Sequence, residues 1–450
     1  MACAVIVTAC ASTRIEVAVP PPSPTVTTAT LVAATPTVTT PAPRSTAEPT
    51  SAPVPTPTPA AVVPGLGRLI GDNFAPLVGK RVGVIANATS TFEGQHIIDL
   101  LAAAPDVDLV AAFAPEHGIR GTADAGAQVA DETDPVTGIP IVSLYGNNRA
   151  PTPASLADLD VLVYDLQDVG ARYYTYISTL GLAMQAAADA GVEFVVLDRP
   201  NPLGGERVAG FTREPELESF VSQYPIPSVY GLTAGELAAA IAGERWLRGL
   251  DALDLTVVPV ANWSRTMRWN ETGLAWVAPS PGLPTATSAL VYPATVLFEA
   301  TSLSFGKGTT TPFELVGAPW LDGAALAAGL NAHDLPGVQF EAITFTPSAD
   351  LAPNPRHGGE EVGGVALRVT DPASFDPVAA GVYLLSMVQQ QATAAGRSSI
   401  IDRPDFFDLL AGTTRLRVEV TNEIPADAIV AGWADDRDAF VAVHNRYRRY

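Results

Sequence analysis

The chain has 450 residues, is 47% hydrophobic and carries a formal net charge of −21 at pH 7. That length is enough for two or three domains with sizeable cores. Such an acidic balance argues against a nucleic-acid partner, because proteins that bind phosphate backbones usually present basic patches. The sequence contains no apolar stretch of about 18 residues, the length that predicts a membrane-spanning helix.

The first residues resemble a lipoprotein signal. The stretch "VTAC" ends at Cys10 and is similar to a bacterial lipobox, in which the cysteine is lipid-modified after cleavage. The basic region and long apolar region of an ordinary signal peptide are absent before Cys10, which a start site assigned too far downstream would explain. We expect residues 1–17 to be a lipoprotein signal and the protein to be extracytoplasmic and lipid-anchored. An apolar N-terminus without function is the alternative.

Residues 18–64 are rich in Pro, Thr, Ala and Val, and their only charged residues are Arg44 and Glu48. Such a composition cannot pack a core, and its prolines favour an extended chain. We therefore expect a disordered linker between the membrane anchor and the folded part. Both cysteines, Cys3 and Cys10, precede the linker, which excludes disulfide, thiolate and cysteine metal chemistry from the folded part.

From residue 65 onward, apolar runs alternate with helical patterns, as is typical of an α/β fold. The expected helices are 96–104 and 173–191, and the expected strands are 81–87, 107–116, 139–146, 159–170 and 192–205. Because these strands are apolar almost throughout, we expect a parallel sheet covered on both faces. This pattern predicts a Rossmann-like catalytic domain over residues 65–290.

Beyond about residue 320 the pattern becomes mixed, and we expect a smaller α+β domain over residues 291–450 that completes the cleft. Residues 290–298 fit either a strand or a helix. Beyond them, alternating patterns predict strands at 339–348 and 361–371, and helical patterns occur at 325–333 and 377–393.

Three of the expected parallel strands run into polar clusters where they end. The clusters are Glu116 with His117, then residues 165–168, then residues 198–201. Open α/β sheets bind ligands beyond the carboxyl ends of their strands, so these side chains share one pocket if the strands are neighbours. For any single cluster, a turn or a helix cap is the alternative.

Motifs for nucleotides and metals are missing from the sequence. No GxGxxG follows the first strand, and the glycines around Lys307 lack the spacing of a phosphate-binding loop. No HExxH motif or cluster of histidines and aspartates with ligand spacing occurs. We expect neither a cofactor nor a metal, and a nucleotide-dependent oxidoreductase is disfavoured.

Four segments carry a family resemblance when taken together and in order. They are FAPEHGIRG (113–121), VYDLQDVGARYYTYISTL (163–180), VLDRPNPLGG (196–205) and FEATSLSFGKGTTTPFE (298–314). With these segments the chain resembles the exo-β-N-acetylmuramidase NamZ family, glycoside hydrolase family 171, over residues 66–450. The resemblance implies a Rossmann-like domain and a second domain that completes an active-site cleft.

The same resemblance implies an activity and a partner. It implies an exo-acting glycosidase that releases N-acetylmuramic acid from the non-reducing ends of peptidoglycan fragments during cell wall recycling. Muramyl saccharides would then be the partners. A non-catalytic glycan-binding surface lipoprotein is the alternative function. The chain departs from the family pattern at Lys307, where Arg is usual, and at Gly282, where Asn is usual. Lysine keeps the charge but lacks the planar fork of arginine.

Glycoside hydrolysis usually needs two carboxyl groups, one protonated as the acid and one ionised. We expect Glu116 to be the acid, with Asp168 as the first choice for its partner and Asp165 and Glu299 as alternatives. Candidates for binding the lactyl carboxylate of muramic acid are Arg120, Arg172 and Arg199. The other expected substrate contacts are His117, Gln167, Tyr174, Asp198, Asn201, Glu299 and Lys307.

Overall fold

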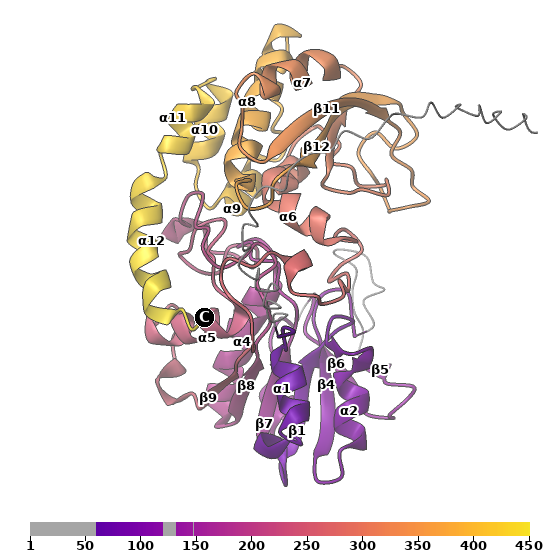
Figure 1. Cartoon of the computed structure of the whole chain (residues 1–450), viewed down its shortest axis with the longest axis vertical. Coiled ribbons are helices and arrows are strands. Elements are labelled where there is room, and N and C mark those ends of the chain that lie inside the picture. The colour runs from indigo at the N-terminus through magenta and orange to yellow at the C-terminus, as the bar shows by residue number, and fades with distance from the viewer. Residues whose placement is uncertain (1–59, 120–131, 147) are drawn as a thin grey trace, which may run out of the picture. The chain divides into compact units, whose positions relative to one another are not determined.

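The computed structural model describes residues 60–119, 132–146 and 148–450. Cys10, Arg120 and nearly all of the expected linker lie outside the described residues. The described residues belong to one compact unit, which contains a large sheet and a smaller one (Figure 1).

The large sheet has seven strands in the order β5-β6-β4-β1-β7-β8-β9 in the part of the chain that the structure describes. Their bounds are β1 Arg81–Ala86, β4 Asp108–Ala114, β5 Glu132–Thr133, β6 Pro140–Ser143, β7 Val161–Asp165, β8 Glu193–Leu197 and β9 Leu255–Val258. All pairings are parallel except that of β5 with β6. The expected parallel sheet is confirmed.

Helices cover both faces of this sheet because its strands are apolar on both faces. Leu162 and Tyr164 of β7 face one hydrophobic core, whereas Val161 and Val163 face another. The first core contains residues of α4 (Tyr176–Ala190) and α5 (Ala234–Gly243), and the second contains residues of α1 (Gly65–Gly71) and α2 (Ile97–Ala103). The alternation of side chains along each strand thus builds the three layers.

The strand order reverses between β1 and β7. From β1 the chain adds β4 and β6 on one side, and it then returns to place β7, β8 and β9 on the other side. Ligand sites of open α/β sheets lie beyond the carboxyl ends of the strands at such a reversal. A ligand site is therefore expected at the segments that follow β1, β4 and β7.

The smaller sheet is antiparallel and has the order β10-β12-β11. Its strands are β10 (Leu315–Ala318), β11 (Val338–Phe345) and β12 (Val362–Val369), and they pack with α6 (Ala286–Thr295), α7 (Gly323–Asn331) and α8 (Pro377–Ala394). This arrangement confirms the expected α+β region. Residues 290–298 are helical, since α6 is followed by a 3₁₀ turn at Val296–Ala300.

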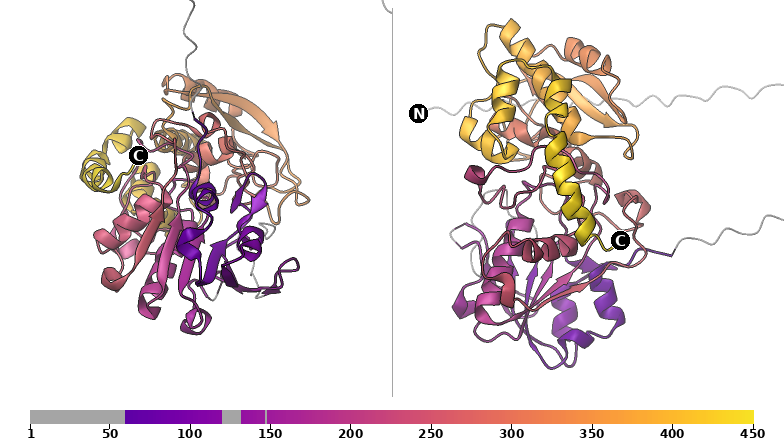
Figure 2. Two further views of the ribbon diagram at one scale, coloured as in Figure 1. Left: turned by 60° about the horizontal axis from the view of Figure 1, so that its bottom comes forward. Right: turned by 90° about the vertical axis from the view of Figure 1, so that its left-hand side faces the viewer.

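Four helices beyond α8 were not predicted. They are α9 (Pro404–Ala411), α10 (Arg415–Thr421), α11 (Ala426–Ala431) and α12 (Ala434–Tyr447). Figure 2 shows α12, in yellow, running from the C-terminal helices back to α5 beside the large sheet.

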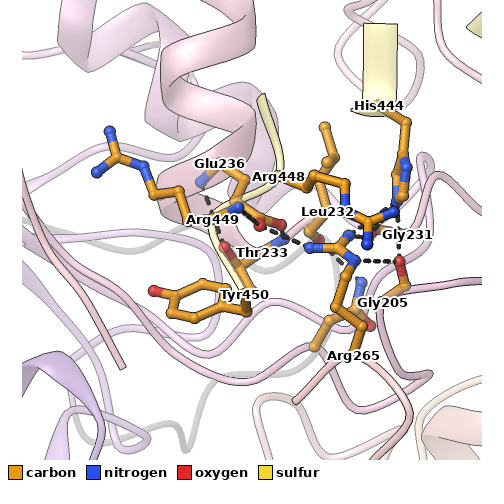
Figure 3. Close-up of polar contacts among 12 residues, drawn as sticks. Gly205, Gly231, Leu232, Thr233, Glu236, Arg265, His444, Arg448, Arg449 and Tyr450 are labelled. Carbon is orange, nitrogen blue, oxygen red and sulfur yellow. Dashed lines mark hydrogen bonds and ion pairs between the residues drawn. The ribbon is translucent and has the colours of Figure 1, made fainter. Parts of the chain in front are cut away.

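Buried polar contacts fix the C-terminus where α12 ends (Figure 3). Arg265 forms an ion pair with Glu236 at 2.6 Å, and both side chains are almost completely buried. The backbone N–H of Arg449 donates to the same carboxylate at 2.6 Å, and the Tyr450 hydroxyl donates to Asp198 at 2.7 Å. The last residues of the chain are thereby held against the loops of the large sheet.

Candidate active site

Glu116 follows β4 in a tight turn. The Gly118 N–H donates to the Pro115 carbonyl at 3.0 Å, and His117 has a φ of 75°, which is strained for a residue with a side chain. The turn brings the Glu116 carboxylate to the start of α4, where the Thr175 hydroxyl donates to its Oε2 at 2.9 Å. A helix N-terminus carries partial positive charge, which suits a carboxylate at this position.

A wall of tyrosines lies beside Glu116. The rings of Tyr174 and Tyr176 meet edge to face at 4.8 Å, and the rings of Tyr174 and Tyr292 do so at 6.0 Å. Burial raises the pKa of each of these phenols, and the negative charge of Glu116 adds to the effect at Tyr176 and Tyr292. These tyrosines are therefore neutral at pH 7.

Glu299 lies on the 3₁₀ turn after α6, close enough to Tyr292 for its charge to contribute to the raised pKa of that phenol. Burial raises the pKa of Glu299 to about 7; the Lys307 cation opposes this shift, the Glu116 carboxylate adds to it, and Arg403 opposes it. The Glu299 carboxyl accepts no hydrogen bond from a described residue. The charge of Glu116 thus acts on Glu299, and Glu299 can hold a proton near neutral pH.

Glu299 and Lys307 line one cavity of about 130 Å³. Phe305 and Phe313 form part of its wall, with their rings stacked at 5.1 Å. Phe313 also packs edge to face on Tyr292 at 4.8 Å, which makes the cavity wall continuous with the tyrosines beside Glu116. Gly282 lines the same cavity, so both positions that depart from the family pattern lie here.

A larger cavity of about 660 Å³ lies beyond the carboxyl ends of β1, β7 and β8. Gln167 and Arg199 line it, together with Trp269 and apolar residues. Its volume is in the usual range for small-molecule sites, but neither Glu116 nor Glu299 belongs to its lining. Of the polar clusters at the strand ends, Gln167 and Arg199 thus line this cavity and Glu116 does not.

Asp165 and Arg199 pair with each other at the ends of β7 and β8. The Arg199 Nε donates to Asp165 Oδ1 at 2.6 Å, and an Nη donates to Oδ2 at 2.9 Å. Asp165 is completely buried and Arg199 is only 7% exposed. This pair holds two adjacent strand ends together, and Asp165 has no face left for a substrate.

One carboxylate oxygen of Asp168 is bonded to its own loop and to Tyr230. Its Oδ2 accepts hydrogen bonds from the Gly170 N–H at 2.8 Å and from the Tyr230 hydroxyl. Burial raises the pKa of Asp168 to about 6, although both hydrogen bonds oppose the shift. Asp168 lines neither of the two cavities. Its Oδ1 has no hydrogen-bond partner among the described residues, so Asp168 and Glu299 both remain candidates for the partner of Glu116.

The structure does not support a substrate contact for Arg172. The guanidinium is completely buried and donates to four backbone carbonyls at 2.6–3.0 Å, those of Phe211, Ile226, Leu410 and Ala411. Burial lowers the pKa of Arg172 to about 10. The side chain ties the loop after β7 to α9 and is not accessible to a ligand.

Asp198 and Asn201 also serve the fold. Asp198 accepts hydrogen bonds from the Thr233 hydroxyl at 2.7 Å and the Gly235 N–H at 2.8 Å. The Asn201 amide donates to the Leu232 carbonyl at 2.9 Å. Neither residue lines the two cavities described above.

Sequence reasoning missed the residues that surround the two glutamates. Thr175 and Tyr292 were not among the predicted site residues, and neither were Phe305 and Phe313. Phe305 and Phe313 lie in the segment 298–314, one of the four that carry the family resemblance, and this membership could have marked them as candidates. Within the described residues, no group of three histidine, cysteine or acidic side chains is placed to hold a metal, and no helix is long and apolar enough to cross a membrane.

Comparisons with known proteins agree over nearly the whole described part. The family models for exo-beta-N-acetylmuramidase NamZ match at residues 82–287 for the N-terminal domain and 290–450 for the C-terminal domain. The chain is 41% identical over 397 residues to the peptidoglycan beta-N-acetylmuramidase NamZ of Bacillus subtilis (strain 168), covering 86% of this chain and 91% of that protein.

Two solved structures are also similar, both of DUF1343 family proteins from Bacteroides fragilis NCTC 9343. One has a TM-score of 0.80 at 38% identity and covers 88% of this chain and 100% of that one. The other has a TM-score of 0.72 at 32% identity and covers 87% of this chain and 99% of that one.

Proposed function

The chain belongs to the exo-β-N-acetylmuramidase NamZ family, and on that premise we propose that it releases N-acetylmuramic acid from the non-reducing ends of peptidoglycan fragments. The observation that carries the proposal is that the carboxyl groups of Glu116 and Glu299 lie beside the same tyrosines, where the charge of Glu116 adds to the raised pKa of Glu299. Cleavage of a glycosidic bond usually needs such a pair, one group protonated and the other ionised.

Glu299 fits the role of the general acid. Burial raises the pKa of Glu299 to about 7, and a general acid works best when its pKa lies near the operating pH. Glu299 would donate its proton to the glycosidic oxygen as the bond to the leaving group breaks. This assignment gives Glu299 the role that the sequence suggested for Glu116.

Glu116 fits the role of the ionised carboxylate. It lies at the start of α4 and is held there by hydrogen bonds from the Thr175 and Tyr145 hydroxyls. In this role it would stabilise the positive charge that develops at the anomeric carbon and would act as nucleophile or base.

The proposal is tested with a chromogenic β-N-acetylmuramide and the matching glucosaminide. The purified protein should hydrolyse the muramide and leave the glucosaminide almost unchanged, and it should remove single residues from the non-reducing ends of glycan fragments. Equal turnover of both substrates, or cleavage inside intact glycan strands, would contradict an exo-muramidase.

We further infer that the protein acts outside the cytoplasm, on a lipid anchor, in cell wall recycling. The support is the "VTAC" stretch at Cys10 and the Pro/Thr-rich residues that follow it. When the protein is expressed with an upstream start restored, it should fractionate with membranes, and Cys10→Ala should release it. If both forms are equally soluble, the likeness to a lipobox is accidental.

A further inference from the structure

The cavity beside Glu299 combines one cation with apolar walls. Lys307 supplies the cation, and Phe305, Phe313 and Leu351 are among the apolar residues. Lys307 makes no hydrogen bond or ion pair with any described residue. A ligand group that suits this lining carries a carboxylate and a small apolar part side by side.

The loop that carries Lys307 is held rigidly. Gly306 and Gly308, on either side of Lys307, have φ angles of 79° and 83°, a region that other residues rarely adopt. A Cβ on Gly308 would lie 2.8 Å from the Ser348 carbonyl oxygen, and the Ser348 N–H donates to the Gly308 carbonyl at 2.7 Å. The ammonium group is therefore presented from a fixed backbone, which lowers the entropy lost on binding.

The described arginines near the two glutamates are occupied or lie outside this cavity. Arg172 is bonded to four carbonyls, and Arg199 is paired with Asp165. Arg403 lies over the Phe406 ring, 4.3 Å from its centroid, and does not line the cavity.

We propose that Lys307 selects muramic acid by binding the carboxylate of its lactyl ether in the cavity beside Glu299. This inference rests on the proposed function and names the part of the substrate that the site recognises. N-Acetylmuramic acid differs from N-acetylglucosamine by this ether alone, which carries one methyl group and one carboxylate. The methyl group contacts the Phe305 and Phe313 rings, and the carboxylate accepts hydrogen bonds from the ammonium group.

Two further features of the cavity fit this assignment. Gly282 brings no side chain into the cavity, and a Cβ there would approach Phe313 to 3.3 Å, so glycine leaves room for the ether. Glu299 keeps its proton near pH 7 because burial raises its pKa, and a neutral Glu299 does not repel the substrate carboxylate.

The lactyl carboxylate also changes the electrostatics of the acid. The charged groups that act on Glu299 are Lys307, Glu116 and Arg403, and Lys307 is the largest of the three effects on its pKa. A carboxylate bound to Lys307 offsets that cation and so raises the pKa of Glu299 in the complex. The substrate thereby helps to keep its own general acid protonated.

The test compares Lys307→Met, Lys307→Arg and, as a matched control, Arg403→Met on three chromogenic substrates. These are the β-N-acetylmuramide, the same compound with its lactyl acid as a methyl ester, and the β-N-acetylglucosaminide. Lys307→Met should lower kcat/KM for the muramide by about 10- to 100-fold, the scale of a charge-assisted hydrogen bond. The wild type should lose a similar factor in kcat/KM on the methyl ester. Lys307→Arg should recover most of the activity on the muramide. Arg403→Met should keep the preference for the muramide over the glucosaminide.

The pH dependence supplies a second readout. In the wild type, the alkaline limb of kcat should lie at higher pH than that of kcat/KM, and this difference should vanish in Lys307→Met. An equal loss on all three substrates, or an ester hydrolysed as fast as the acid by the wild type, would overturn the inference. If the wild type hydrolyses no muramide, the proposed function fails instead, and calorimetric binding of free N-acetylmuramic acid to wild type and Lys307→Met still decides the role of Lys307.

Discussion

Glu236 is completely buried and Glu299 is half-buried, and the surroundings of the two carboxyl groups differ completely. The Glu236 carboxylate accepts hydrogen bonds from Arg265 and Arg449 at 2.6 Å and from the Thr233 N–H at 3.0 Å. Glu299 accepts none from the described residues, and burial raises its pKa to about 7. One glutamate holds the C-terminus against the large sheet, whereas the other makes no such contact within the described residues.

The difference shows how the fold handles a buried carboxyl group. Burying an ionised carboxylate is costly unless partners replace its lost hydration. At Glu236, a guanidinium and backbone N–H groups supply those partners (Figure 3). At Glu299 the cost is reduced by keeping a proton, which is the state that a general acid needs.

The largest expected effect comes from removing the proton donor. Glu299→Gln should lower kcat on natural fragments by roughly 10²–10⁴-fold, the usual contribution of a positioned acid, and should leave the free energy of unfolding unchanged or higher. A dinitrophenyl muramide needs little protonation of its leaving group, so this substrate should recover much of the lost rate.

The control for that experiment is Glu116→Gln, measured on the same two substrates. As nucleophile or base, Glu116 should cause a similar loss that the dinitrophenyl substrate does not rescue. Rescue of Glu116→Gln and not of Glu299→Gln would return the acid role to Glu116. If the dinitrophenyl substrate rescues neither variant, Asp168 becomes the candidate acid, and Asp168→Asn should be measured on the same two substrates.

Removing the cation that pairs with Glu236 should lower the stability of the protein and leave its kcat almost unchanged. Arg265→Met leaves Glu236 buried without its cation, which typically costs about 3–5 kcal/mol, so the midpoint of urea unfolding should fall sharply. The kcat of the protein that remains folded should stay within about threefold of the wild type, because the hydrogen bonds of Arg265 go to Gly205, Gly231, Glu236 and His444 and not to Glu116 or Glu299. The double variant Arg265→Met with Glu236→Gln should regain part of the stability. A selective loss of kcat without a loss of stability would show that the two clusters are coupled.

The fold and the place of Glu116 could be predicted because their signals are local. Apolar strands of five to seven residues that end in polar clusters predict a parallel sheet and its reactive edge, and β7 illustrates this with five buried residues. Glu116 follows β4 in the same way. Each of these inferences needs only neighbours along the chain.

The roles of Arg172 and Glu299 could not be predicted because their surroundings come from distant segments. The carbonyls bonded to Arg172 belong to residues near 211, 226 and 410, so no local pattern distinguishes it from an arginine that faces a ligand. Glu299 is set apart because no described residue donates a hydrogen bond to it and because the charges of Lys307 and Glu116 act on it. Such features exist only once the chain has folded.

The smallest expected effect is the pH dependence of stability, and it separates the two glutamates again. The folded-state pKa of Glu299 is raised from 4.5 to about 7, so between these values the folded protein binds more protons than the unfolded chain does. The contribution of Glu299 to stability is therefore greatest below about pH 4.5 and falls as the pH rises towards 7. Asp168 and Asp198, whose pKa values burial raises to about 6, contribute with the same sign, so the wild type alone does not isolate Glu299. The difference in unfolding free energy between Glu299→Gln and the wild type does isolate it, and this difference should grow in favour of the variant from pH 5 to pH 7. A difference that stays constant over this range would mean that Glu299 is ionised in the folded protein and that the general acid is another group.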